Sequence, residues 1–329
     1  MNILLTGATG FLGYRTLEKL VEDSMVSRIL ATGRNLPEYR RIIHPKVQYV
    51  FGKLEDASFA NEITQDQDVI INTASLSSPW GKEKDFIIAN VRTQENLLNA
   101  AKASGVRRFI YISSPGIYFN GRHRLNVKES DPLPARFANA YASTKFAAET
   151  LLPGTGIPYI ILRPRALIGR GDSIIMPRLI QAFDQGKLRI IGDGSNLVDL
   201  TSVANVADAV LLSVHAKDAA LNQAYNITNG EPVNLWVEIS AVLHALNREL
   251  GSKKVPWLLA DTFARMMELR SRLGNQKEPA LTRYSVGTLA FSFTLDISKA
   301  KRLLGYAPQL NTRQAIDEFI SWYRQHEKM

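Results

Sequence analysis

A phenol and an ammonium group stand four residues apart at Tyr141 and Lys145. On a helix, residues with this spacing lie on one face, one turn apart. The ordinary pKa of tyrosine is about 10, and a positive charge about 4 Å away at an effective dielectric near 20 contributes roughly 4 kcal/mol, or about three pKa units. Tyr141 could therefore exchange a proton near neutrality. Ser114 could hydrogen-bond the oxygen that gains or loses that proton.

These three residues also have ordinary structural explanations. Tyr141 could pack on a helix face, Lys145 could be a solvated charge and Ser114 could cap a helix. Their positions favour chemistry, because the Tyr–Lys pair opens a helical pattern and Ser114 follows the strand-like run Phe109–Ser113. Ligands bind beyond the carboxyl ends of parallel strands. We therefore interpret the three residues as a proton-transfer site for an alcohol or carbonyl oxygen.

Three glycines follow the first apolar run, Asn2–Thr6, and must position a ligand beside that site. Gly7 lets the chain turn sharply, Gly10 leaves room for a pyrophosphate, and Gly13 lets the next helix pack close to the strand. The N–H groups and the positive dipole end of that helix then face the phosphates. A tight turn without a ligand is the alternative, but the flanking strand and helix stand in the order that a dinucleotide site requires.

Apolar runs alternate with helical patterns through the first half of the chain. This alternation predicts an α/β fold of the Rossmann type, a doubly wound parallel sheet with helices on both faces. We expect strands at Asn2–Thr6, Arg28–Thr32, Val47–Phe51, Val69–Asn72, Phe109–Ser113 and Tyr159–Arg163, and helices from about Gly10, at Lys82–Ser104 and at Tyr141–Leu152.

The rhythm changes after about residue 165, where loops lengthen. We predict a dinucleotide-binding domain at residues 1–165 and a smaller C-terminal substrate-binding lobe at residues 166–329, partly interleaved with it. Helices of the second half are expected at Val203–Ala216, Leu235–Leu250, Pro256–Leu273 and Thr312–Gln325.

The composition narrows the class of protein. The 329 residues are 45% hydrophobic and include no cysteine, which excludes disulfides and thiolate sites and fits a reducing cytoplasm. We see no signal-peptide pattern and no run near the roughly 18 apolar residues of a membrane span. The net charge of +9 is scattered, with short pairs such as Arg40-Arg41, so we expect neither nucleic-acid binding nor stable membrane insertion. The five histidines show no metal-ligand spacing.

Together these motifs resemble the extended short-chain dehydrogenases/reductases of the NAD-dependent epimerase/dehydratase superfamily. The similarity spans essentially the whole chain and rests on Gly7 to Gly13, Asn90-Val91, Ser113-Ser114, Tyr141 to Lys145, and Arg163-Pro164 with Gly169 to Asp172.

The resemblance implies a role for each residue of the site. Tyr141 would be the general acid/base, Lys145 would hold the nicotinamide ribose and lower the Tyr141 pKa, and Ser114 would polarise the reacting group. A homodimer through the helices at Lys82–Ser104 and Tyr141–Leu152 is also implied. The implied cofactor-binding residues are Gly7, Thr9, Gly10, Phe11, Leu12, Gly13, Arg34, Lys53, Leu54, Thr73, Ala74, Asn90, Tyr141, Lys145, Arg163 and Pro164.

Motifs of the second half are similar to the 3β-hydroxysteroid dehydrogenase-like branch, which includes 2-alkyl-3-oxoalkanoate reductases and sterol carboxylate decarboxylases. That similarity implies interconversion of a ketone and a secondary alcohol on a small hydrophobic substrate. The motifs are Ile191 to Asp199, Val203 to Asp208, Tyr225 to Gly230, Pro279 to Arg283, Asp296 to Ala300 and Leu304 to Tyr306.

Two positions depart from the nucleotide-sugar enzymes of the superfamily. Val198 and Ala166 stand where those enzymes usually present an arginine and an asparagine, although Arg163, Arg165 or Arg170 could compensate. A nucleotide-sugar epimerase, dehydratase or reductase is therefore the first alternative. A non-catalytic NADP-binding sensor is the second.

Arg34, directly after the second strand, favours NADP, with NAD as a further possibility. No acidic residue lies between Val26 and Pro37 to bind a ribose 2′-hydroxyl, whereas an arginine can pair with the 2′-phosphate. A loop arginine pointing to water is the alternative. Lys53 and Leu54 stand where relatives usually have an aspartate at the adenine, so that contact could pass to the backbone or gain a cation.

The segment from Val255 to Leu269 is rich in apolar residues, among them Trp257, Phe263 and Met266. It could pack in a core, cover a hydrophobic substrate pocket, or contact a membrane as an amphipathic helix. Its basic flanks, Lys253-Lys254 and Arg270 with Arg272, fit the last of these without deciding it.

Overall fold

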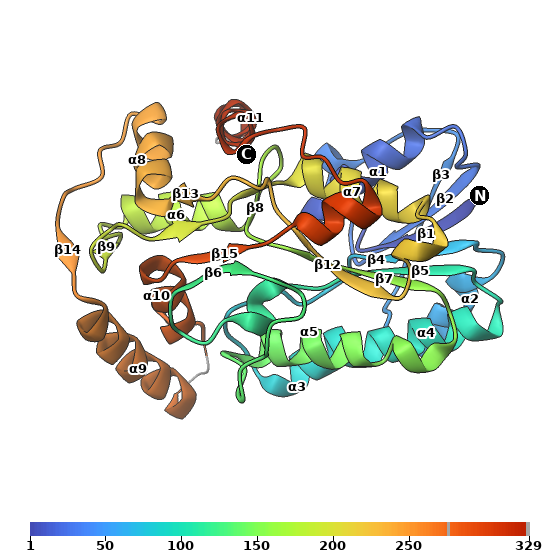
Figure 1. Ribbon diagram of the computed structural model, residues 1–329, viewed down its shortest axis with the longest axis horizontal. Helices are drawn as coiled ribbons and strands as arrows, with labels where there is room; N and C mark the ends of the chain where they lie inside the picture. The colour runs from blue at the N-terminus through green and yellow to red at the C-terminus, as the bar shows by residue number, and fades with distance from the viewer. Residues whose placement is uncertain (275–276, 327–329) are drawn as a thin grey trace.

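The computed structural model describes residues 1–274 and 277–326, and its centre is a seven-stranded parallel sheet (Figure 1). The strand order is β12-β7-β5-β4-β1-β2-β3, so the order reverses between β1 and β4. In α/β sheets, ligands bind at such a reversal, beyond the carboxyl ends of the strands. The strands are β1 (Asn2–Thr6), β2 (Arg28–Gly33), β3 (Val47–Phe51), β4 (Val69–Asn72), β5 (Arg108–Ile112), β7 (Tyr159–Pro164) and β12 (Gln223–Ile227).

The predicted Rossmann-type sheet is confirmed, and all six predicted strands belong to it. The register places Ile3 of β1 between Ile29 of β2 and Val69 of β4. The seventh strand, β12, comes from the second half and pairs with β7 at the edge. The division of the chain into two domains at residue 165 stays a prediction.

Alternate residues of β1 enter different cores, as the period of two along a strand requires. Ile3 and Leu5 pack with α1 (Phe11–Glu22) and α7 (Val203–Val214), while Leu4 packs with α2 (Ala57–Thr64), α4 (Thr93–Ala103) and α5 (Ala140–Thr150). Figure 1 shows these two helical layers on opposite faces of the sheet.

The helix predicted from Lys82 to Ser104 is present but changes its winding. It starts as α3 (Glu83–Phe86), widens into a π-helical segment (Ile87–Arg92) and continues as α4. Such wide turns commonly occur at functional sites. Asn90 lies in the widened segment.

The second lobe gathers around its own apolar cluster, which includes Ile180, Val198 and Phe319. Its elements are α6 (Ile175–Asp184), α8 (Leu235–Ala245), α9 (Trp257–Leu273), α10 (Arg283–Ala290), α11 (Thr312–His326), the sheet β13-β10-β15-β6 (Val233–Asn234, Leu197–Val198, Phe293–Leu295 and Arg124–Val127), and the pairs β8–β11 (Leu167–Ile168, Thr201–Ser202) and β9–β14 (Ile190–Ile191, Lys254–Val255). Short helical turns lie at Glu38–Arg40, Pro115–Tyr118, Pro153–Thr155, Asp218–Ala220 and Ala300–Leu304.

Of the four helices predicted for the second half, α7, α9 and α11 lie close to their expected bounds. The helix predicted to reach Leu250 ends at Ala245, because Asn247 adopts a left-handed φ of 59° and Arg248 N bonds back to the Leu243 carbonyl. Across residues 1–274 and 277–326, the helices are all too short or too polar to cross a bilayer.

Candidate active site

The glycine turn between β1 and α1 is packed tightly against the end of β4. Gly7 has a φ of 69°, and a Cβ there would lie 2.7 Å from Ala74 N and Thr73 Oγ1. A Cβ at Gly13 would lie 2.0 Å from the Gly7 carbonyl oxygen, so the start of α1 closes on the turn. Gly10 is the N-cap of α1. Among the described residues, a Cβ added to Gly10 would come near the Gly7 carbonyl oxygen alone. This arrangement fits a pyrophosphate at the N-terminus of α1.

Asn90 joins three parts of the site through its buried amide. Its Oδ1 accepts from Leu76 N at 2.8 Å, and its Nδ2 donates to Thr144 Oγ1 of α5 at 3.0 Å. The widened helical segment thereby holds the loop after β4 against the helix that carries Tyr141. These contacts give Asn90 a positioning role; its direct contact with a cofactor stays a prediction.

Tyr141 and Ser114 come together as the sequence predicts. Ser114 caps the short helix Pro115–Tyr118, and its Oγ accepts from Gly116 N at 3.1 Å. Burial raises the pKa of Tyr141 to about 12, although hydrogen bonds with the hydroxyls of Ser114 and Ser75 act to lower this pKa. Sequence reasoning missed Ser75, which the loop after β4 brings across the sheet edge.

A second phenol, Tyr284 of α10, reaches the same place from the C-terminal lobe. A Cβ added to Gly116 would lie 3.2 Å from Ser114 Oγ and 3.5 Å from the Tyr284 hydroxyl. The negative charge of an ionised Tyr284 would raise the pKa of Tyr141, in addition to the larger effect of burial. Sequence reasoning missed Tyr284 because only the packing of α10 brings it here.

Lys145 lies one helical turn after Tyr141 and is 2% exposed. Its Nζ donates to the Ile112 carbonyl at the end of β5 and lies 4.4 Å from the centre of the Tyr111 ring. Burial lowers the pKa of Lys145 to about 7, against the opposing effect of the Glu149 carboxylate. The expected lowering of the Tyr141 pKa by Lys145 is not found, because burial dominates at both residues.

The buried ammonium predicts a specific pH dependence of stability. The folded pKa of Lys145, about 7, lies below the unfolded value of about 10.4. Burial of the charge therefore destabilises the fold fully below about pH 7, and this cost disappears as the pH rises towards about 10. The stability of the wild type relative to Lys145→Met should rise by up to a few kcal/mol across this range. Urea unfolding of both proteins at several pH values measures the difference, and parallel curves would contradict it.

Arg163 makes contacts that differ from the predicted role in cofactor binding. Its Nε donates to Glu149 Oε1 at 2.9 Å, its second nitrogen pairs with Glu149 Oε2, and its third bonds the Tyr118 hydroxyl. The guanidinium is buried, and the Glu149 carboxylate raises its pKa. These contacts tie β7 to α5 and indicate a bracing role. Pro164 follows at the carboxyl end of β7.

The adenosine side of the predicted site contains Thr9, Gly33 and Arg34. A Cβ at Gly33 would lie 2.3 Å from Thr9 Oγ1, so the glycine turn packs directly on the end of β2. Arg34 follows this contact and is exposed, as is Lys53 beyond β3; Leu54 is half-buried. Phe11 is buried in the first turn of α1, and Leu12 beside it is half-buried.

Arg40, which the sequence suggested only as part of a scattered basic pair, is buried behind the glycine turn. It donates to the Thr9 carbonyl at 3.0 Å and to the Gly171 carbonyl at 3.1 Å. Arg40 therefore fixes the turn to the loop that precedes α6. No motif distinguishes it, because both contacts depend on tertiary packing.

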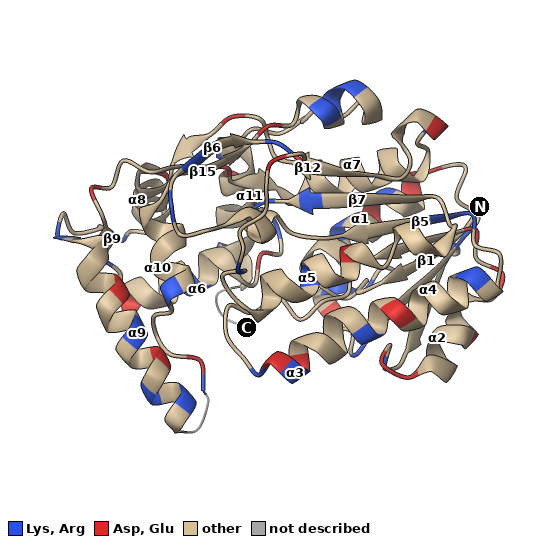
Figure 2. Ribbon diagram, turned by 60° about the horizontal axis from the view of Figure 1, so that its bottom comes forward, with Lys and Arg blue, Asp and Glu red and all other residues tan. Residues whose placement is uncertain are grey.

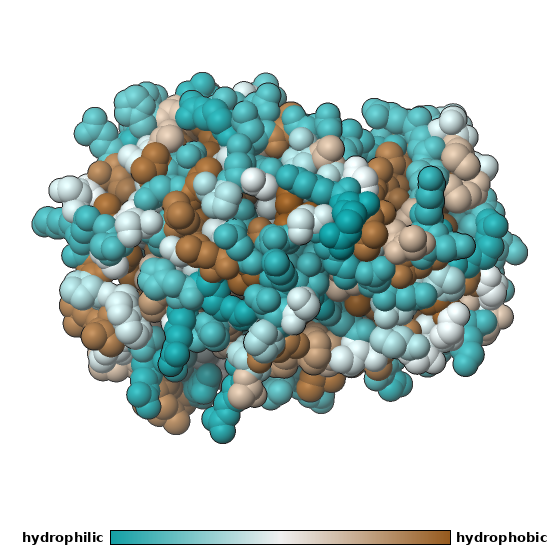
Figure 3. Space-filling model, in the orientation of Figure 1, coloured by the Kyte–Doolittle hydropathy of each residue, from teal (hydrophilic) through white to brown (hydrophobic). Residues whose placement is uncertain are grey.

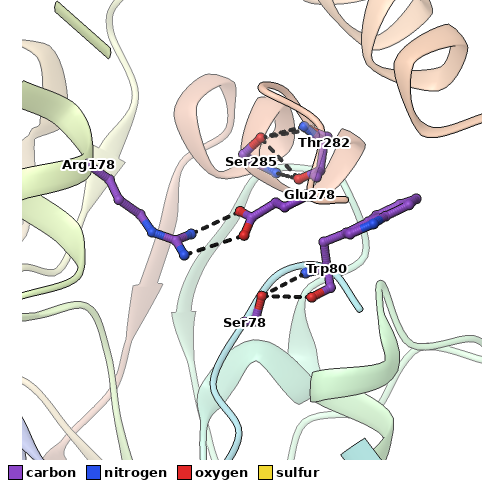
Figure 4. A network of polar contacts seen from close by, with 6 residues as sticks. All are labelled: Ser78, Trp80, Arg178, Glu278, Thr282 and Ser285. Atoms are coloured by element: carbon purple, nitrogen blue, oxygen red, sulfur yellow. Dashed lines mark hydrogen bonds and ion pairs between the residues drawn. The ribbon is translucent and has the colours of Figure 1, made fainter. Parts of the chain in front are cut away.

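A cavity of about 590 Å³ lies in the second lobe, with Leu179, Ile191, Val255, Phe263 and Leu281 among its apolar lining residues. Pro79, from the loop that carries Ser75, also lines it, as do Thr282 and Ser285 beside Tyr284. Figure 4 shows the polar side: Arg178 of α6 pairs with Glu278 at 3.0 Å, and Thr282 and Ser285 form the capping box of α10. The cavity thus borders both segments that reach Tyr141.

Val198 and Ala166, the two positions that depart from nucleotide-sugar enzymes, also have apolar surroundings in the structure. Val198 is buried in β10 between Val233 and Phe293. Ala166 has a φ of 41° and packs against the apolar cluster of the second lobe. Arg165 donates to the Phe293 carbonyl at 3.0 Å, and Arg170 pairs with Glu18 at 2.8 Å. Both arginines therefore already have bonding partners within the chain.

A glycine turn that fits a pyrophosphate lies beside half-buried Ser114 and Tyr141 and buried Lys145 at the carboxyl edge of a parallel sheet, and this combination defines a dinucleotide-binding oxidoreductase. The chain belongs to the NAD dependent epimerase/dehydratase family, which matches residues 3–228.

Relatives place the chain more narrowly. It is 34% identical to 3beta-hydroxysteroid-dehydrogenase/decarboxylase isoform 1 of Arabidopsis thaliana, over 96% of this chain and 78% of that one. It is 30% identical to the 2-alkyl-3-oxoalkanoate reductase of Stenotrophomonas maltophilia, over 96% and 97%. The predicted membership of the extended short-chain dehydrogenases/reductases and of the 3β-hydroxysteroid dehydrogenase-like branch is confirmed. The chain is an NAD(P)-dependent dehydrogenase/reductase.

Among solved structures, UDP-glucuronic acid 4-epimerase from Bacillus cereus in complex with NAD is similar, with a TM-score of 0.75 over all of both chains. The two sequences are 22% identical. At this identity the likeness shows the shared fold alone.

Proposed function

We propose that the chain is an NADP-preferring oxidoreductase that interconverts a ketone and a secondary alcohol on a hydrophobic substrate. The observation that carries this proposal is the grouping of the Ser114, Ser75 and Tyr141 hydroxyls beside buried Lys145. Residues 1–165 would form the cofactor domain and residues 166–329 the substrate lobe, in the cytoplasm.

The residues of the chain handle the proton of this reaction. A bound nicotinamide cofactor supplies or accepts the hydride. In reduction, the Tyr141 hydroxyl donates a proton to the carbonyl oxygen while Ser114 donates a hydrogen bond to the same oxygen. In oxidation, Tyr141 takes the alcohol proton back. Burial raises the pKa of Tyr141 to about 12, so near neutrality the hydroxyl carries the proton that the reduction consumes.

The cofactor would lie along the carboxyl edge of the sheet. The N-terminus of α1 would hold the pyrophosphate, with Gly10 leaving the backbone accessible. Thr73 and Ala74, packed on Gly7, would border it, and Lys145 would reach the nicotinamide ribose. Asn90 and Arg163 would keep α5 in place through their buried contacts.

A homodimer through α4 and α5 is part of the proposal. Figure 1 shows these two helices running side by side along one face of the molecule. Pairing about a two-fold axis is the commonest symmetric assembly.

The cavity of about 590 Å³ would hold the hydrocarbon part of the substrate. Each methylene buried there contributes about 0.8 kcal/mol, so kcat/KM should rise about fourfold per added methylene until the cavity is full. We expect NADPH oxidation with long-chain β-keto acids or ketosteroids and none with UDP- or GDP-sugars.

A homologous series of β-keto acids, followed by absorbance of NADPH, measures this dependence. Calorimetry with UDP-glucose is the matched control for binding. Micromolar binding of the nucleotide sugar, with no turnover of any hydrophobic ketone, would reverse the assignment. Cofactor binding without turnover of any substrate would indicate a sensor.

A further inference from the structure

The helix α9 presents most of its large apolar side chains to solvent. Ala260 and Ala264 are its buried residues. On the opposite side lies a row that we call the α9 stripe, 49% to 82% exposed, whose members follow helical spacing: Leu258, Leu259, Phe263, Met266, Leu269 and Leu273. Figure 3 shows apolar surface where α9 lies, at the lower left of the molecule. Contiguous apolar surface of this kind marks an interaction site.

The acidic and basic residues of α9 also lie on different sides of the helix. Its acidic residues turn towards α10, where Asp261 pairs with the Arg283 guanidinium at 2.9 Å and Glu268 accepts from Arg283 N at 2.8 Å. Arg265 and Arg270 are exposed beside the stripe. Figure 2 shows positively and negatively charged residues along α9. The acidic ones, Asp261 and Glu268, are bonded to Arg283 of α10. The outward surface is therefore apolar and basic.

We propose that the α9 stripe docks on the anionic surface of a lipid bilayer, with α9 lying parallel to the membrane plane. Helices that lie in such interfaces combine an apolar face with flanking basic residues and do not cross the bilayer. Basic residues close to an anionic leaflet add to the attraction. Docking on one face agrees with the finding that the described helices cannot span a membrane.

A second copy of this chain fits the stripe less well. Two-fold pairing brings the same surface patch of both copies into one interface. Arg265 and Arg270 of both copies would then gather there, in a protein whose net charge is +9. A lipid surface supplies both the hydrocarbon and the opposite charge.

The stripe is continuous with the cavity of the second lobe. Phe263 belongs to the stripe and also lines the cavity, together with Ala260 and Val255. A docked molecule would bring this wall of the cavity to the hydrocarbon layer, so a lipophilic substrate could enter without crossing bulk water. This consequence rests on the proposed function, whereas the docking itself does not.

Sedimentation of the full chain with vesicles tests the docking. We use phosphatidylcholine vesicles with and without phosphatidylserine, and compare the wild type with Met266→Gln/Leu269→Gln, whose residues lie outside the cavity lining. We expect binding to the phosphatidylserine vesicles that weakens with salt. Loss of two apolar contacts should weaken it about tenfold or more. Val237→Gln, at an exposed apolar position on α8, is the matched control and should bind as the wild type does.

The basic residues are tested separately with Arg265→Gln/Arg270→Gln. Binding to phosphatidylserine vesicles should fall about fivefold for each arginine removed. No vesicle binding by the wild type, or equal binding by all variants, would overturn the proposal. A solution mass that is half the wild-type mass in Met266→Gln/Leu269→Gln, with no vesicle binding by either protein, would assign the stripe to a second copy instead. None of these measurements depends on turnover, so they are independent of the proposed reaction.

Discussion

Tyr141→Phe is expected to lower turnover about 100-fold or more, the usual scale of general acid–base catalysis. The substitution removes the proton that the Tyr141 hydroxyl would donate and leaves a ring of almost the same size. Because the glycine turn is untouched, NADPH binding should remain close to that of the wild type. Steady-state kinetics with an active ketone and fluorescence titration of NADPH separate these two effects.

Tyr159→Phe provides the control for this experiment. Tyr159 opens β7 at the amino end of the sheet, away from the carboxyl edge. Its loss should leave turnover unchanged. If Tyr141→Phe also kept near-wild-type turnover, Tyr141 could not be the proton donor. Tyr284 would be the next residue to examine, because its hydroxyl lies near Gly116, as the Ser114 hydroxyl does.

Arg34→Ala should reduce the preference for NADPH over NADH by about 10- to 150-fold, since a hydrogen bond to a charged group contributes roughly 1.5–3 kcal/mol. Arg34 is exposed beside the contact of Gly33 with Thr9, where a ribose 2′-phosphate would lie. Dissociation constants of the two cofactors, measured for each protein, give the ratio directly.

Arg28→Ala is the matched substitution at the other end of β2, where Arg28 bonds Gln48 at 2.7 Å. It should leave the ratio unchanged. Equal losses of NADPH and NADH affinity in Arg34→Ala would show that Arg34 does not bind the phosphate. Lys53→Ala then tests the second exposed cation beyond the sheet.

The sheet was largely predictable because its strands are short apolar runs closed by turn residues. The exception is the edge strand β12, where Gln223 and the buried Asn226 interrupt the apolar pattern. Asn226 uses its amide to bond the Val127 carbonyl of β6, a contact that no local pattern reveals.

The candidate site was predictable where a motif fixes the geometry and not where packing does. The glycine turn, Ser114 and Tyr141 follow local rules for turns, strand ends and helix spacing. Ser75, Tyr284 and Arg40 reach the site from segments that are remote in sequence, so their types and spacing carry no signal. For Arg163, the sequence indicated its position at the end of a strand, but not its ion pair with the buried Glu149 carboxylate.

The return of the chain to the edge of its first sheet sets a delay during synthesis. When residues 1–165 have left the ribosome, β7 is still an open edge, and its partner β12 ends about 60 residues later at Ile227. At typical elongation rates this interval lasts roughly 3 to 12 seconds. Throughout it, the nascent chain exposes an apolar strand edge and the face of α1 that α7 later covers. Binding by a chaperone would be most useful in that interval.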